Sequence, residues 1–162
     1  LSLWENAVLE RIWSPEFSRR GLVRRRAARA ATTEIIKGYD VRGAGVDSRI
    51  RLLSGGNMQK LILGRALSAD PDILVAAQPS RGLDEGAIAA VHARLLEARA
   101  RGAGVLLISE DLDEVLALSD RVMAIVGGRL SPAIPSDDAD ARRLGLMMAG
   151  DWAEAGEDAH AV

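Results

Sequence analysis

Cysteine is absent from this chain of 162 residues, so disulfide bonds and thiolate metal sites are excluded. Aromatic residues make up only 3% of it. No apolar run approaches the roughly 20 residues of a membrane-spanning helix, and no basic segment before an apolar one opens the chain as in a secretory leader. The remainder is 48% hydrophobic and 27% charged, with a net charge of −2. This composition predicts a soluble globular unit with its own core, which reaches any membrane through a partner.

Lysine is also scarce, and its two positions exclude one phosphate-binding motif. Lys37 follows Ile36 and Lys60 follows Gln59, so neither lysine follows a glycine. A P-loop, whose glycine-rich backbone cradles phosphates, requires Gly-x-x-x-x-Gly-Lys-Ser/Thr. The chain therefore contains no P-loop.

The most informative segment runs from Leu53 to Lys60. Ser54 is followed there by two glycines, an asparagine and an apolar-periodic helix. A helix start collects unpaired N–H groups and the positive end of the helix dipole, so it suits a phosphate. Gly55 and Gly56 let the backbone approach that anion closely because they have no Cβ. An ordinary capped helix start has the same pattern, so the segment alone leaves both interpretations open.

Strand and helix patterns alternate through the middle of the chain. The predicted strands are 73–77, 105–108 and 121–126, and the predicted helices are 58–67, 85–100 and 112–118. Gly127-Gly128 predicts a tight hairpin turn after the last strand. Strands separated by helices indicate an α/β fold whose mostly parallel sheet is covered by helices.

The two flanks are predicted to be mainly helical. Apolar residues recur at helical spacing within residues 1–12, and 24–37 predicts a second helix. Ser136 begins a predicted helix that extends to about Ala149. The acidic, alanine-rich end beyond it is predicted to be a loose tail, with Trp152 as a packing anchor or a functional side chain.

Four segments resemble the ATP-binding-cassette (ABC) ATPases, in the order and spacing of that family. Leu53–Lys60 resembles their signature loop and helix, and Ile73–Asp84 resembles their Walker B strand and D-loop. Val105–Asp111 resembles their switch region, and Leu118–Arg129 resembles their closing strand pair. The resemblance implies a P-loop NTPase fold of the ABC type, present in part, with a remnant of the helical subdomain.

Three details are similar to the second cassette of importers for simple sugars and nucleosides, namely Asn57, Pro79–Asp84 and Ser109–Glu114. The resemblance implies that 1–52 is part of the helical subdomain, 53–130 the signature helix and second half of the nucleotide-binding core, and 131–162 the C-terminal helix and tail. The first half of the cassette, with its P-loop, is then expected to be missing, as in a fragment or a truncated gene product.

In the family, two cassettes face each other, and the signature of one meets the ATP held by the P-loop of the other. Carried over to this chain, Ser54, Gly55, Gly56 and Asn57 would contact the γ-phosphate of that ATP. Ser54 would donate through its hydroxyl and Gly56 through its N–H. ATP and Mg²⁺ would be held mainly by the partner cassette. Asp84 would lie at the D-loop interface and couple the two sites; its alternative role is an N-cap after a plain turn, and both roles can coexist.

The positions that carry hydrolysis in the family are changed here. Ala77 and Gln78 stand where the Walker B strand has an Asp that holds water on Mg²⁺ and a Glu that polarises the attacking water. A methyl group cannot order a hydrated Mg²⁺, and an amide cannot accept a proton from water. Glu110 stands where the switch His is expected, and a carboxylate repels a γ-phosphate. No catalytic residue is predicted in this chain's own site, which is expected to turn over poorly.

Other candidate sites are weaker. His92 and His160 are isolated, so no metal site is predicted. An acidic cluster is better explained as a solvated helix start; it comprises Glu110, Asp111, Asp113 and Glu114. Arginines gather at 19–20 and 24–26, and clustered arginines can bind nucleic-acid or lipid phosphates. In a slightly acidic chain without interleaved aromatics, a solvated helix face is the favoured interpretation.

The sequence therefore predicts part of the ATP-binding subunit of an ABC importer for simple sugars or nucleosides. The expected partners are a second cassette, fused by resemblance, transmembrane permease subunits and, indirectly, a solute-binding protein, with no nucleic acid. The expected location is the cytoplasmic face of the plasma membrane. ATP hydrolysis is expected of the full complex and not of this chain alone. The alternatives are a nucleic-acid-linked ABC ATPase and an inactive truncated cassette.

Overall fold

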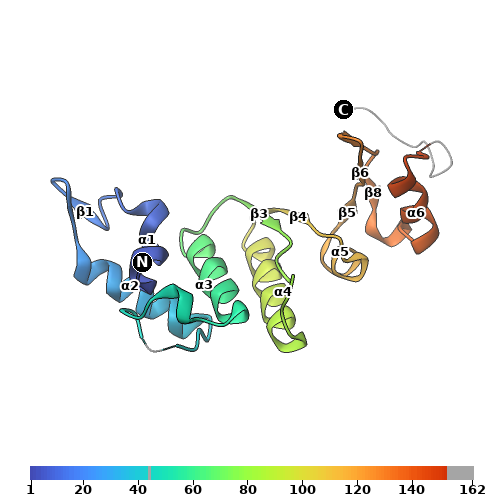
Figure 1. Ribbon diagram of the computed structural model, residues 1–162. Coiled ribbons are helices and arrows are strands. Elements are labelled where there is room, and N and C mark those ends of the chain that lie inside the picture. Colours follow the sequence, from blue (N-terminus) through green and yellow to red (C-terminus); the bar gives the residue numbers. More distant parts are fainter. Residues whose placement is uncertain (44, 153–162) are drawn as a thin grey trace. The chain divides into compact units, whose positions relative to one another are not determined.

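The computed structural model describes residues 1–43 and 45–152 (Figure 1). The chain divides into two compact units, Leu1–Leu106 and Leu107–Val162, and each is described by itself. In the described part, every sheet has two strands. None of the described helices combines the length and the apolar character that crossing a membrane requires.

Three helices pack together in the first half of unit 1, namely α1 (Leu3–Val8), α2 (Arg25–Gly38) and α3 (Gly55–Leu67). Short 3₁₀ turns at Leu9–Arg11 and Ile50–Leu52 and a hairpin of β1 (Ser18–Arg19) and β2 (Leu22–Val23) connect them. Apolar side chains from all three helices share one core, which includes Leu3, Ala7, Ile35 and Leu61. The helices predicted in residues 1–12 and 24–37 are confirmed, the first as a short helix that continues into a 3₁₀ turn.

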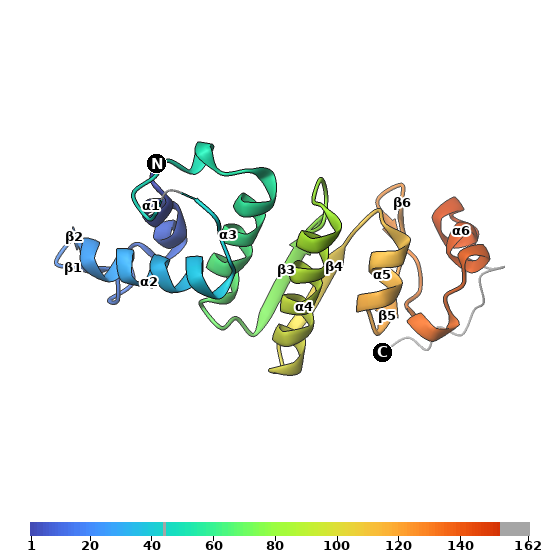
Figure 2. The same ribbon diagram turned by 90° about the horizontal axis from the view of Figure 1, so that it is seen from below.

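The second half of unit 1 alternates strand and helix as predicted. β3 (Ile73–Ala77) and β4, which starts at Gly104 and ends at Ile108, are neighbours in one sheet. α4 (Glu85–Ala100) connects them and lies along one face of this pair (Figures 1 and 2). Burial alternates along β3, where Leu74 and Ala76 are buried while Ile73 and Val75 are exposed. This period of two is the one expected of a strand covered on one face.

Unit 2 continues with α5 (Leu112–Leu118), four short strands and α6 (Ala141–Ala149). β5 (Arg121–Val122) pairs antiparallel with β8 (Ile134–Pro135), and β6 (Ile125–Val126) pairs antiparallel with β7 (Arg129–Leu130). The core of this unit brings together Val122, Ile134, Ala139, Leu144 and Met147. The predicted hairpin turn is confirmed, because Gly127 and Gly128 both have positive φ and join β6 to β7.

The predicted single strand over 121–126 is wrong, because two strands with different partners occupy this range. Between them, the N–H of Ala124 donates to Ser131 Oγ at 2.9 Å, and the N–H of Ser131 donates to the Ala124 carbonyl at 2.8 Å. These bonds hold the middle of the segment outside either ladder. The change of strand partner, from β8 for β5 to β7 for β6, therefore depends on Ser131, which lies later in the chain.

The predicted helix start at Ser136 is also wrong. Ser136–Asp138 forms a 3₁₀ turn, and α6 begins after Asp140, whose Oδ1 accepts from the Arg143 N–H at 2.7 Å. The predicted end is confirmed, since Gly150 closes α6 in the left-handed conformation. Trp152 is a packing anchor: it packs on the core of unit 2, and its indole N–H donates to the Met147 carbonyl at 3.1 Å. The tail from 153, including His160, lies outside the described residues.

Candidate functional site

The start of α3 carries the segment that the sequence singles out. Ser54 is the N-cap in an extended conformation, and its Oγ accepts from the Asn57 N–H at 3.4 Å and from Asn57 Nδ2 at 2.9 Å. Ser54 and Gly55 are exposed. A Cβ at Gly55 would meet nothing within 4 Å, and one at Gly56 would lie 3.8 Å from Ala87 Cβ. The first turn of α3 is thus open to a ligand.

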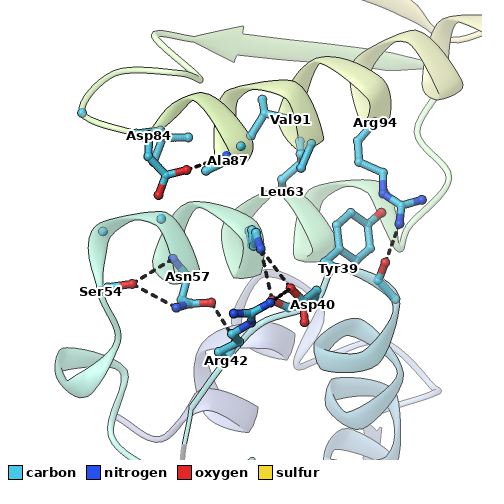
Figure 3. Close-up of a pocket in the computed structure, with 18 of the residues that line it drawn as sticks. Tyr39, Asp40, Arg42, Ser54, Asn57, Leu63, Asp84, Ala87, Val91 and Arg94 are labelled. Carbon is cyan, nitrogen blue, oxygen red and sulfur yellow. Dashed lines mark hydrogen bonds and ion pairs between the residues drawn. The ribbon is translucent and has the colours of Figure 1, made fainter.

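A cleft of about 860 Å³ lies beside this helix start (Figure 3). Its walls come from three segments, namely 37–42, the first turns of α3 as far as Leu63, and the chain from Gly82 to Arg94. The predicted signature residues and Asp84 line this same cleft, although almost thirty residues separate them in sequence. The structure therefore brings together the phosphate-contact residues and the D-loop residue that the sequence predicts.

Asp84 also caps α4. Its Oδ1 accepts from the Ala87 N–H at 2.8 Å (Figure 3), which confirms the structural role foreseen for it. The loop before α4 is also bonded to α3, because Gln59 Nε2 donates to the Pro79 carbonyl at 2.9 Å. The signature helix and the segment that carries Asp84 are therefore held to each other by direct contact.

A charged network that joins the segment 37–42 to α3 is not foreseen from the sequence. Asp40 Oδ2 lies 3.3 Å from an Arg42 guanidinium nitrogen and 3.4 Å from Lys60 Nζ. The hydrogen bond and charge of Arg42, followed by the hydrogen bond of Lys60, lower the pKa of Asp40 below its usual range. Asp40 has a φ of 47°, a left-handed conformation that is uncommon outside glycine. Two cations and one ionised carboxylate thus link the segment 37–42 to α3.

Arg94 extends the network from α4. Its guanidinium lies 4.8 Å from the centroid of the Tyr39 ring, and it donates to the Gly38 carbonyl. Burial raises the pKa of the Tyr39 hydroxyl, against the opposing effect of the Arg94 charge. The sequence could have indicated Lys60, because it lies one helical turn beyond Asn57 and so on the same face of the helix. Asp40, Arg42 and Arg94 carry no motif, so only the fold assigns them to the cleft.

The resemblance predicts three altered hydrolytic positions, Ala77, Gln78 and Glu110. Ala77 ends β3, and Gln78 follows it in the left-handed region, with a φ of 50°. Neither residue lines the cleft. Glu110 follows β4 in unit 2 and is exposed. Among residues 1–43 and 45–152, no three His, Cys, Asp or Glu side chains gather as a metal site requires. Ala77 and Gln78 carry no carboxylate that could bind Mg²⁺.

The remaining candidates have structural explanations. Asp111 caps α5, accepting from the Asp113 and Glu114 N–H groups at 3.0 and 3.2 Å. The acidic cluster is therefore a helix start, but it is not wholly solvated, because Glu114 is only 3% exposed. Arg24 donates to the carbonyls of Pro15 and Glu16 and so fixes the turn before α2.

His92 lies within α4. Among the described residues, it belongs to no group of three or more potential metal ligands.

Known proteins similar to this chain are ATP-binding proteins of importers. It is 41% identical over 152 residues to the glucose import ATP-binding protein TsgD13 of Haloferax volcanii, covering 93% of this chain and 28% of that protein. It is 41% identical over 146 residues to the guanosine import ATP-binding protein NupO of Bacillus subtilis, covering 90% and 29%. The chain thus spans less than a third of the length of these relatives. No protein-family model matches it.

Solved structures show the same fold. A dimeric ATP-binding cassette in a post-hydrolysis state, bound to ADP and Pi, matches with a TM-score of 0.69 and 23% identity, over 84% of this chain and 57% of that one. An ATP-binding subunit of an ABC transporter matches with a TM-score of 0.67 and 23% identity, over 96% and 62%. The predicted α/β fold of the ABC type, present in part, is confirmed. Together with the sequence relatives, these structures show that the chain has part of the fold of an ATP-binding cassette and is similar in sequence to ATP-binding proteins of importers.

Proposed function

We propose that this chain is part of the ATP-binding subunit of an importer for simple sugars or nucleosides. In this role it supplies its signature segment to an ATP held by a partner cassette. The names of the relatives support the import of sugars and nucleosides. The observation that carries the proposal is the exposed start of α3, which lies on one cleft with Asp84.

The contact that we propose is electrostatic. The Ser54 hydroxyl and the N–H groups at the start of α3 would donate to the oxygens of the γ-phosphate, with the helix dipole aligned toward its charge. Gly55 and Gly56 leave room for that approach. Phosphoryl transfer depends mainly on positioning and charge stabilisation. A donor set fixed by a helix start therefore suits the transfer without an acid or base from this chain.

We also propose that the nucleotide site to which this chain contributes its own Walker B strand is catalytically poor. Ala77 offers no ligand, and Gln78 offers an amide in place of a carboxylate. Glu110 would bring negative charge toward the phosphate. The cassette would then be used asymmetrically, with its signature serving one site and its altered positions the other.

The partners follow from the same role. The second cassette would complete the ATP site. Transmembrane permease subunits would hold the protein at the cytoplasmic face of the membrane. A solute-binding protein would be an indirect partner, through the permease. The proposal includes the division of the chain into part of the helical subdomain (1–52), the signature helix and second half of the core (53–130), and the C-terminal helix and tail (131–162).

The test is ATP turnover by the complete ATP-binding protein reconstituted with its permease in liposomes. We expect turnover that rises when the imported sugar or nucleoside is supplied with its binding protein. The control is the same preparation without solute. Turnover that no sugar or nucleoside changes would contradict the importer role. Steeply salt-dependent binding of DNA or RNA would favour the nucleic-acid-linked alternative.

A further inference from the structure

We propose that Asn57 is a positioning residue, whose side-chain amide directs the hydroxyl hydrogen of Ser54 outward to a phosphate oxygen. This inference rests on the proposed function, because it concerns the same contact. It assigns Asn57 a role different from the one its place in the signature suggests: the amide is bound within the chain and acts through Ser54.

The orientation of the amide is set by a backbone group. The N–H of Arg42 lies 2.7 Å from Asn57 Oδ1 (Figure 3). A backbone N–H can only donate, so the partner atom must be the amide oxygen and not the amide nitrogen. The Asn57 NH₂ group is therefore held on the side away from Arg42, where Ser54 lies.

The orientation of the serine hydroxyl then follows. Asn57 Nδ2 lies 2.9 Å from Ser54 Oγ and must donate to it, and the Asn57 N–H approaches the same oxygen at 3.4 Å. A hydroxyl has two acceptor positions and one hydrogen. Both acceptor positions are directed at Asn57, which leaves the O–H of the exposed Ser54 to point away from α3.

This arrangement selects for a ligand that accepts hydrogen bonds. Ionised phosphate oxygens only accept, so they match a hydroxyl whose acceptor positions are already filled. A hydroxyl free to rotate would have to be ordered when the phosphate binds, whereas this one is ordered beforehand. Asn57 also ties the start of α3 to the segment 39–42 on the other wall of the cleft.

Two substitutions separate these roles. Asn57→Asp keeps the shape and can still accept from the Arg42 N–H, but its second oxygen can only accept and would draw the Ser54 hydrogen inward. Asn57→Leu removes both bonds without adding charge. Asn6→Leu is the matched control, since it removes an amide that donates to the Ser2 carbonyl at 2.9 Å and does not line the cleft.

The measurement is kcat and KM for ATP in the complete ATP-binding protein with its partner cassette, for each substitution with Ser54 present and in a Ser54→Ala background. We expect Ser54→Ala to lower kcat roughly 10- to 100-fold, and Asn57→Leu about 3- to 10-fold when Ser54 is present. In the Ser54→Ala background, Asn57→Leu is expected to change kcat less than about 2-fold, because the group that it positions is gone. Asn6→Leu is expected to leave kcat within the same margin.

Asn57→Asp is compared in the same two backgrounds, with Ser54 present and with Ser54→Ala. Its effect in the Ser54→Ala background measures charge repulsion alone, and we expect a larger loss when Ser54 is present. Equal effects of both Asn57 substitutions in the two backgrounds would overturn the positioning role while leaving the proposed function intact. An unchanged kcat in Ser54→Ala itself would overturn both.

Discussion

Single side chains make the cleft electrostatically asymmetric. Asp40 forms ion pairs with Arg42 of its own segment and with Lys60 of α3, whereas the start of α3 faces the opening with uncharged donors. The Asp40 carboxylate partly neutralises these two cations, which would otherwise attract any anion to this part of the cleft. The groups proposed to meet the phosphate are therefore dipoles and a hydroxyl, while Arg42 and Lys60 are engaged in ion pairs with Asp40.

The Asp40 ion pairs give the stability of unit 1 a pH dependence. Because the folded state lowers the pKa of Asp40, its contribution is fully present above the unfolded value near pH 4 and is lost as pH falls through the lowered value. We expect urea midpoints of the wild type to fall below about pH 4 more steeply than those of Asp40→Asn. The pairs are exposed, so the difference between the two proteins is expected to be small and to shrink in salt.

At this scale, the sequence identifies residues that belong to a motif. Ser54, Gly55, Gly56 and Asn57 are recognisable because a helix start with that composition has a physical purpose. Arg42 is not, because its contribution to Asn57 is a backbone N–H, which every residue except proline carries. Its role depends on where the 39–42 segment lies, and no side-chain pattern encodes that.

Helices in unit 1 approach closely where glycine permits it. An added Cβ at Gly64 of α3 would lie 2.5 Å from Ile35 Cγ2 and 2.9 Å from Tyr39 Cδ2, both contributed by α2 or its end. Since Tyr39 lines the cleft, the packing of α3 on α2 also sets the position of the 39–42 wall.

Gly64→Ala is accordingly expected to destabilise the chain by about 1–3 kcal/mol, because the overpacked contact forces side chains or helices to shift. Gly38→Ala is the matched control: it ends α2, meets nothing within 4 Å, and is expected to be neutral or slightly stabilising. Urea denaturation of both variants measures the difference. Equal midpoints would show that the α2–α3 contact tolerates the extra methyl group.

The cap of α4 allows the two roles of Asp84 to be separated. Asp84→Ala removes the acceptor for the Ala87 N–H and is expected to cost about 1 kcal/mol of unfolding free energy. Asp84→Asn retains a capping oxygen and removes the charge, so its stability is expected to match the wild type within a few tenths of a kcal/mol.

The ATP turnover of Asp84→Asn in the complete protein then reports the interface role alone. Lower turnover at unchanged stability is the expected result if Asp84 couples the two cassettes. Unchanged turnover would reduce Asp84 to a helix cap.

Elements with a strong local pattern were predictable. The strand β3, the helix α4 and the Gly127-Gly128 turn all follow from their own residues. The break between β5 and β6 was not, because it depends on Ser131, which bonds to Ala124 from outside the strand. The start of α6 was misplaced because several acidic residues compete as caps, and only the geometry selects Asp140.

At the scale of the whole molecule, the chain covers about 28–30% of the length of its curated relatives. Its activity is therefore a property of the complete protein. The proposed function combines a signature that serves another site with a Walker B strand that lacks carboxylates. These two features together predict unequal use of two nucleotide sites.

Introducing Ala77→Asp and Gln78→Glu together in the complete protein is expected to raise ATP turnover less than about 2-fold while Glu110 remains. The new general base at position 78 contributes only if Glu110 does not repel the γ-phosphate. The added substitution Glu110→His is expected to produce a further gain. Turnover should be compared at saturating ATP. A large gain from the first two changes alone would show that Glu110 does not repel the phosphate.

The central claim is that the signature of this chain acts on ATP bound by the partner cassette. The most direct measurement is kcat for ATP in the complete protein with its permease, when Ser54→Ala is introduced in this cassette and the partner cassette is left unchanged. The account predicts a loss of roughly 10- to 100-fold in kcat, while the loss of the helix cap costs about 1 kcal/mol of unfolding free energy and leaves the chain folded. An unchanged kcat would contradict it, because the exposed start of α3 would then be a helix cap and nothing more.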